Sequence, residues 1–223
     1  MVIPELVIFN FLESLLAFVK KDINSNTDKT KTIIYYLFNN IKFQNFDFYK
    51  SALEFLTREA DNPRQLQVRL GFDSSRAVMP TVHITLPSER SGQQGIGIDE
   101  GYVENEVDTT EKKENPIYTR IYECQYACII TSDNVLEVTL LYNLLKGLLV
   151  GSLDILELNG LRNIKLSGQD MQLSEEIVPI NVFAKGLMLD FFYEVSVKKL
   201  LPNNLISHLE FEGTPLLQNT TSI

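Results

Sequence analysis

The chain has 223 residues, enough to bury a substantial core in one large domain or two small ones. Hydrophobic residues make up 44% and charged residues 22%, which are ordinary values for a globular protein. The formal net charge of −9 argues against a protein that grips DNA over a broad face, because such a face is rich in lysine and arginine. An acidic surface favours solubility, and it also lets DNA pass without sticking.

The N-terminal part is predicted to be helical. Residues 4–21 place apolar side chains at helical spacing, and Pro4 suits the first turn. Glu5 and Glu13 interrupt the apolar stretch, which argues against a membrane span. The segment also lacks the basic N-terminal region and the cleavage site of a signal peptide. We therefore expect a protein that is made in the cytoplasm. A polar loop (24–31), a segment ambiguous between strand and helix (32–43) and a short helix (46–60) follow.

From residue 65 the pattern is typical of strands. Residues 65–72 and 80–87 alternate between apolar and polar side chains, and the second segment is bounded by prolines. His83 falls on the more polar parity, so we expect it to face solvent or a neighbouring strand rather than to act as a base.

A glycine-rich segment after this strand raises the question of a phosphate site. It contains Gly92, Gly95, Gly97 and Gly101. A P-loop needs a lysine directly after its glycines, but no lysine or arginine follows these glycines until Lys112. A dinucleotide-binding fingerprint opens a helix, but no helical pattern follows here. Residues 99–114 carry seven carboxylates against two lysines and would repel phosphate. Their spacing does not match an EF-hand either, so we expect a solvated acidic loop.

A long strand (117–131) and a leucine-rich helix come next. The helix is expected to be capped by Ser132 or Asp133 and to stop near Gly151. Cys124 and Cys128 lie on one face of the strand, about 13 Å apart at ~3.3 Å per residue, which is too far for a disulfide.

The C-terminal part is predicted to be mostly β. A turn at Asn159-Gly160 precedes short strands at 162–166 and 169–173, and a long strand within 180–200 has one apolar face that only Lys185 interrupts. The other face of that strand is expected to meet solvent or a partner. Residues 199–223 are predicted to be an extended tail.

The order of elements predicts an α+β fold, with an antiparallel β-sheet flanked by helices on one face. We expect a single domain over 1–198, a long β-hairpin-like insertion arm at 88–116, and an extended C-terminal tail at 199–223. An insertion of about 29 residues is long, and such loops are usually functional or disordered. We place the tip of the arm around Gly92 to Gly101. The residues expected to contact other proteins are Gly92, Gly95, Gly97, Asp99, Glu100, Gly101, Tyr102, Glu104, Glu106 and Asp108.

No catalytic pattern emerges from the sequence. There is no G-x-S-x-G elbow, the two histidines are His83 in a strand and His208 in the tail, and tryptophan is absent. Two cysteines and two histidines make a zinc site improbable. We therefore expect a protein that is not an enzyme and that has no cofactor and no metal.

The pattern over 117–198 resembles the tail-terminator and tail-completion family of tailed bacteriophages. The resemblance lies in a long strand ("YTRIYECQYACIITSDNV"), a leucine-rich helix ("EVTLLYNLLKGLL"), a turn with short strands ("GLRNIKLSGQDMQL") and a second long strand ("VPINVFAKGLMLDFFYEV"). The N-terminal helix and the strand "MPTVHITLP" extend it to the first half. The longer insertion and the long tail depart from the family pattern, which leaves the ring size and the neighbouring proteins open.

This resemblance implies a structural virion protein, made in the host cytoplasm, that forms a ring at the phage neck or at the head-proximal end of the tail. Its partners would be further copies of itself, in a hexameric or dodecameric ring, and neighbouring neck, portal or tail proteins. DNA would only pass through the channel, and no membrane would be involved. The family has no catalytic residues to transfer to this chain. The alternatives are another non-enzymatic phage adaptor, such as a head-completion or baseplate-type subunit, and a small enzyme or ligand-binding domain.

Overall fold

The structure is a computed structural model. It describes residues 2–58, 62, 64–71, 80–91, 102–108, 113–171 and 182–198, with the backbone alone for 102–108, 113–118 and 197–198. The predicted tail (199–223) lies outside these residues.

The described chain contains both helices and strands, which confirms the α+β class. The helices are α1 (Pro4–Ser25), the short 3-10 helix η1 (Lys29–Lys31), α2 (Ile33–Phe38), α3 (Phe48–Leu56), α4 (Val135–Val150) and α5 (Leu153–Leu158). The strands are β1 (Lys42–Phe43), β2 (Phe46–Asp47), β3 (Gln67–Leu70), β4 (Thr81–Ser91), β5 (Tyr102–Asp108), β6 (Lys113–Ser132), β7 (Leu161–Met171) and β8 (Phe183–Lys198). Strands β1 and β2 form a small hairpin of their own.

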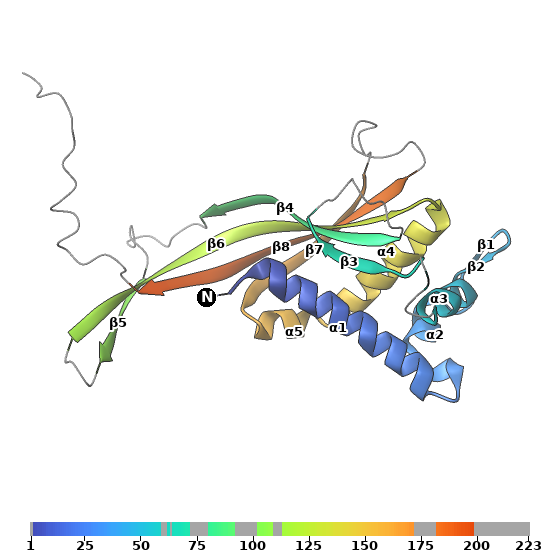
Figure 1. The fold of residues 1–223 in the computed structure, drawn as a ribbon, viewed down its shortest axis with the longest axis horizontal. Coiled ribbons are helices and arrows are strands. Elements are labelled where there is room, and N and C mark those ends of the chain that lie inside the picture. The colour runs from blue at the N-terminus through green and yellow to red at the C-terminus, as the bar shows by residue number, and fades with distance from the viewer. Residues whose placement is uncertain are drawn as a thin grey trace, which may run out of the picture.

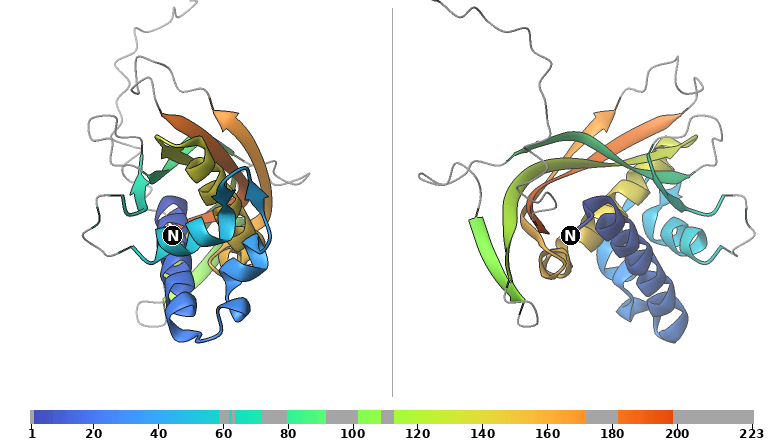
Figure 2. Two further views of the ribbon diagram at one scale, coloured as in Figure 1. Left: turned by 90° about the vertical axis from the view of Figure 1, so that its right-hand side faces the viewer. Right: turned by 60° about the vertical axis from the view of Figure 1, so that its left-hand side comes forward.

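The main sheet has the strand order β3-β4-β6-β8-β7, and β5 pairs with the N-terminal part of β6. Neighbouring strands are antiparallel except β3 and β4, which are parallel. The predicted antiparallel sheet is thus found except at this edge, where the direction differs because an alternating pattern specifies a strand without specifying its direction. The helices cover one face of the curved sheet, as predicted (Figures 1 and 2).

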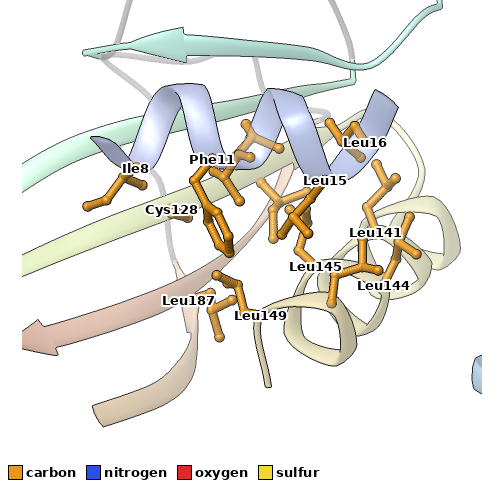
Figure 3. Close-up of a cluster of buried hydrophobic side chains, with 14 of the residues drawn as sticks. Ile8, Phe11, Leu15, Leu16, Cys128, Leu141, Leu144, Leu145, Leu149 and Leu187 are labelled. Carbon is orange, nitrogen blue, oxygen red and sulfur yellow. The ribbon is translucent and has the colours of Figure 1, made fainter. Parts of the chain in front are cut away.

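Helix α4 is the centre of the core. Its apolar face packs on β6 and β8, and α1 lies across it, so that leucines from both helices interdigitate (Figure 3). The N-cap is Asn134, whose side chain accepts a hydrogen bond of 2.9 Å from the backbone N–H of Leu136. The predicted cap at Ser132 or Asp133 is thus displaced by one or two residues. The helix ends at Gly151, as predicted.

The two faces of the sheet differ in how many side chains they bury. On the helix-covered face, Cys124 and Cys128 are buried free thiols, in agreement with the prediction that they do not pair. On the opposite face, Ala127, Ile129 and Ala184 form a second, small buried cluster. His83 is also buried there, and its Nδ1 lies 3.1 Å from the carbonyl oxygen of Gly71. Of the two positions expected for His83, the neighbouring strand is therefore the one that the structure supports.

Lys185 interrupts the apolar face of β8 for a specific reason. Its Nζ donates a hydrogen bond of 2.6 Å to Asp170 on β7 and lies 5.7 Å from the ring centre of Tyr142 on α4. The aliphatic stem can thus pack at the edge of the core while the charge is paired.

Several boundaries differ from the prediction. Strand β4 continues to Ser91 and β6 begins at Lys113, so both strands enter the interval 88–116 that was assigned to the arm. The two short strands expected at 162–166 and 169–173 are one strand, β7, which contains an irregularity between Arg162 and Lys165. Among the described residues, no helix is both long and apolar enough to cross a membrane.

Candidate interaction site

One part of the sheet extends beyond the helices. From here on, the arm means this part of the sheet: β5, residues 113–121 of β6 and residues 194–198 of β8. It shares only β5 and residues 113–116 with the predicted insertion at 88–116. Figure 1 shows it at one end of the long axis of the molecule, with α2 and α3 near the other end. Strand β6 has 20 residues and β8 has 16, and both exceed the usual length of about five or six residues. The arm is therefore a continuation of core strands and not a separate loop.

The base of the arm is tied by a cluster of aromatic and carboxylate side chains. The hydroxyl of Tyr193 on β8 donates a hydrogen bond of 2.5 Å to Oε1 of Glu89 on β4, across the intervening strand β6. The rings of Tyr193 and Tyr122 lie 5.7 Å apart, so that β6 takes part as well. These contacts join three strands at the point where the sheet leaves the helices.

This cluster also contains a shielded thiol. Burial, with a smaller contribution from the nearby Glu89 carboxylate, raises the pKa of Cys124 to about 12. Burial and the hydrogen bond with Glu89 likewise raise the pKa of Tyr193 above its usual value. Both groups therefore stay protonated at neutral pH, and the Cys124 thiol is poorly suited to nucleophilic chemistry.

Polar pairs join β6 and β8 on the face of the sheet that the helices do not cover, both before the arm and within it. Nε2 of Gln125 donates a hydrogen bond of 2.8 Å to Asp190, which lies directly opposite it on β8. Further out, the hydroxyls of Thr119 and Ser196 lie 2.9 Å apart on paired strands. Such cross-strand pairs stabilise one register over its neighbours.

The structure places the predicted contact residues in two groups. Gly92, Gly95, Gly97, Asp99, Glu100 and Gly101 lie outside the described residues. Tyr102, Glu104, Glu106 and Asp108 belong to β5, which lies within the predicted β-hairpin-like insertion, although its bounds were not predicted. The last described pair between β5 and β6 is Asp108 with Lys113, and the predicted tip at Gly92 to Gly101 lies outside the described residues.

The outer edge of β5 has no strand beside it in the described part of the chain. Pairing with β6 runs from Tyr102 with Thr119 to Asp108 with Lys113, so β6 lies along one side of the whole of β5 and the backbone groups of alternate residues point to the other side. Backbone N–H and C=O groups on an unpaired edge are ready to pair with another chain. Among the described residues, β5 therefore presents an open strand edge.

A separate hollow of about 480 Å³ has a charged lining, with Arg58, Arg64, Asp133 and Glu137 among its residues. Arg64 donates hydrogen bonds of 2.7 and 2.8 Å to Asp133, which lower the pKa of that carboxyl. Arg64 also pairs with the buried Glu137 at 2.7 Å. Because these charges already satisfy one another, we assign the cluster to tying the segment around Arg64 to the start of α4. The sequence pattern did not predict it, since its members lie 69 and 73 positions apart.

Candidate metal ligands are not grouped in the described residues, where no three His, Cys, Asp or Glu side chains come together as a cation site. No protein-family model matches the chain, and none of the curated proteins matches it either. What this chain does is therefore inferred from its own pattern and geometry.

Proposed function

We propose that this protein is a structural subunit that assembles with copies of itself into a closed ring. The observation that carries the proposal is the arm, a ribbon of strands that leaves the helix-covered core and presents the unpaired edge of β5. A contact between the arm of one copy and a different surface of the next is heterologous, and heterologous contacts close into rings when their rotation permits.

The sequence pattern supports a more specific place for such a ring. The resemblance to phage tail-terminator and tail-completion proteins favours a virion ring, hexameric or dodecameric, at the neck or the head-proximal tail end. The net charge of −9 suits a channel through which DNA slides, because like charges repel. In this proposal the chain is not an enzyme, and its further partners are neighbouring neck, portal or tail proteins.

The polar ties at the base of the arm support a mechanical role. The hydrogen bond from Tyr193 to Glu89 and the contact between Tyr193 and Tyr122 join β4, β6 and β8 where the ribbon leaves the core. A ribbon that is held at its base presents its edge in a fixed direction, which lowers the entropy lost on assembly.

Negative-stain imaging of the purified full chain tests this proposal. We expect ring-shaped particles with a central hole and a single rotational order. A monomer at all concentrations would contradict the ring, and open filaments or paired particles would instead support another kind of adaptor. To test the virion assignment, an antibody against the chain is applied to phage particles that contain it, with labelling expected at the neck or at the head-proximal end of the tail.

A further inference from the structure

Besides the outer edge of β5, the strand order leaves two terminal strands in the described sheet, β3 and β7. Strand β3 has an open edge. The backbone N–H of Gln67 donates to the carbonyl of Pro80 at 3.3 Å, and that of Gly71 donates to the carbonyl of Ile84 at 2.8 Å. Because backbone groups alternate along a strand, those of Val68 and Leu70 point away from β4. No strand of the described chain lies on that side.

A groove runs beside this edge. It has a volume of about 680 Å³ and lies between β3 and the middle of α1, at residues 13–20. Its lining includes Leu16, Ala17 and Val68 as the apolar part and Glu13, Lys20 and Arg69 as the charged part. The side chain of Leu70 is 48% exposed at the end of the same strand. The groove thus combines an open backbone edge with apolar surface and the guanidinium of Arg69.

Arg69 has no carboxylate partner in the part of the chain that the structure describes. Its guanidinium donates hydrogen bonds of 3.1 and 2.8 Å to the amide oxygen of Gln67, a neutral group. Arg58, Arg64, Arg90 and Arg162, in contrast, all form ion pairs with carboxylates. An arginine beside an open strand edge, without a carboxylate of its own, favours an acidic strand as the occupant.

We propose that this groove receives β5 of a second copy of the chain, which adds to the open edge of β3 as a further strand. The proposal rests on the ring assembly proposed above and names the surface that the arm reaches. Strand β5 of the same chain lies at the far end of the molecule, so the occupant comes from a neighbour (Figure 1).

The two strands match in charge and in pattern. Strand β5 carries Glu104, Glu106 and Asp108 at alternate positions, with Val103 and Val107 between them. On β3, Val68 and Leu70 share the parity of the helix-covered face, whereas Gln67 and Arg69 share that of the opposite face. If the acidic residues of an added strand lie on the same face of the sheet as Arg69, its valines lie on the other face, over the apolar part of the groove.

The other edge of the sheet is less suited to strand addition. Strand β7 is irregular between Arg162 and Lys165, and Asn163 there has a φ of 55°. Bulges and edge charges are the usual devices that block pairing between sheets. The open edge of β3 is therefore the better receiver for β5.

Disulfide trapping in the full chain tests this contact. The native thiols of Cys124 and Cys128 are buried, so we expect only the introduced cysteines to form intermolecular disulfides. Four double variants combine Gln67→Cys with Glu104→Cys, Asn105→Cys, Glu106→Cys or Val107→Cys, and a control combines Lys165→Cys on β7 with Glu106→Cys. We expect covalent oligomer ladders after mild oxidation when the arm cysteine is at 104 or 106, and none at 105 or 107 or in the control.

A proline variant tests the backbone pairing itself. Leu70→Pro removes an N–H that points away from β4, whereas Leu70→Thr keeps it, so both variants should retain the circular dichroism of the unmodified chain. We expect the subunit concentration for half-assembly to rise about tenfold in the proline variant relative to the threonine variant. Charge reversal by Arg69→Glu should also weaken assembly, and Glu106→Lys should restore it.

The outcomes separate the two proposals. Rings that form without ladders from Gln67→Cys, or that give ladders only through Lys165→Cys, would overturn the β3 contact and leave the ring assembly standing. An unmodified chain that does not self-associate at any concentration would overturn both.

Discussion

The hydroxyl of Tyr193 donates a hydrogen bond of 2.5 Å to Glu89, a residue 104 positions earlier in the chain. The bond crosses β6 and joins the two strands on either side of it where the arm begins. Tyr193 is buried there, so its hydroxyl needs this partner. This contact between distant parts of the sequence therefore ties β4 to β8 at the base of the arm.

Removal of this hydroxyl is the first test of the base of the arm. Tyr193→Phe should lower the free energy of unfolding by about 1 kcal/mol, because one hydrogen bond to a charged acceptor is lost without a cavity. Tyr122→Phe is the matched control, since its ring lies 5.7 Å from that of Tyr193 while its hydroxyl bonds to none of the described residues. Urea denaturation of both variants measures the difference, and equal stabilities would contradict the role of the bond.

The buried thiols predict a loss of stability in alkali. The folded-state pKa values of Cys124 and Cys128 are raised from 9.0 to about 12, so the folded state holds both protons more tightly than the unfolded state. Stability from each thiol is fully present below pH 9 and is lost as the pH rises towards 12. Each thiol should contribute a slope of up to about 1.4 kcal/mol per pH unit.

Single replacements isolate these slopes. In denaturant titrations between pH 8 and pH 11, Cys124→Ala and Cys128→Ala should each show a shallower decline of unfolding free energy than the unmodified chain. The comparison uses slopes, because either replacement also changes core packing. An unchanged slope in both variants would show that the thiols are not shielded in the folded protein.

Glu137 is predicted to be the key member of the charged cluster at the start of α4. Glu137→Ala should destabilise the fold by about 2 kcal/mol, because it leaves Arg64, Arg58 and the buried hydroxyl of Ser132 without their shared acceptor. Glu54 lines the same hollow and forms no ion pair with the described residues, so Glu54→Ala serves as the control, with an expected change below about 0.5 kcal/mol. Thermal unfolding followed by circular dichroism compares the two.

Gly168 is predicted to be required for close packing of β7 on α4. A Cβ at this position would lie 1.8 Å from the hydroxyl of Tyr142 and 2.8 Å from its Cζ. Gly168→Ala should therefore cost about 1–3 kcal/mol of stability, as overpacked sites do. The same substitution in a Tyr142→Ala background should cost clearly less, and a double-mutant cycle measures this coupling. Additive effects would contradict the contact.

The sequence pattern located the strongly periodic elements well. Helix α4 follows from its leucine spacing and from Gly151, and β8 follows from its one apolar parity, with Lys185 as the exception that Asp170 and Tyr142 explain. Strand β5 falls inside the predicted hairpin-like insertion, but its bounds were not predicted, because an acidic segment of seven residues lacks a clear apolar alternation. Helix α5 was not predicted because its six residues are too few for helical spacing to show.

Features that depend on tertiary pairing could not be predicted. The parallel direction of β3 and β4 is set by their packing in the sheet, and the apolar alternation of both strands is compatible with either direction. The bond between Tyr193 and Glu89 and the pairing of Arg64 with Glu137 bring together residues from distant segments. The pairing of Tyr102–Asp108 with residues 113–119 of β6 could not be predicted either, because it depends on contacts across the sheet.

The most direct measurement of the central claim is native mass spectrometry of the full chain beside a variant that lacks residues 92–114. In this variant Ser91 is followed by Asn115, and residues 115–121 can close the loop between β4 and β6, because Ser91 pairs with Tyr122. We predict one closed oligomer, at a single integer multiple of the subunit mass, for the full chain. The deletion variant should be a folded monomer that keeps the helical circular dichroism signal and loses only the contribution of the deleted strands. A full chain that stays monomeric, or a deletion variant that still forms the same oligomer, would contradict the account.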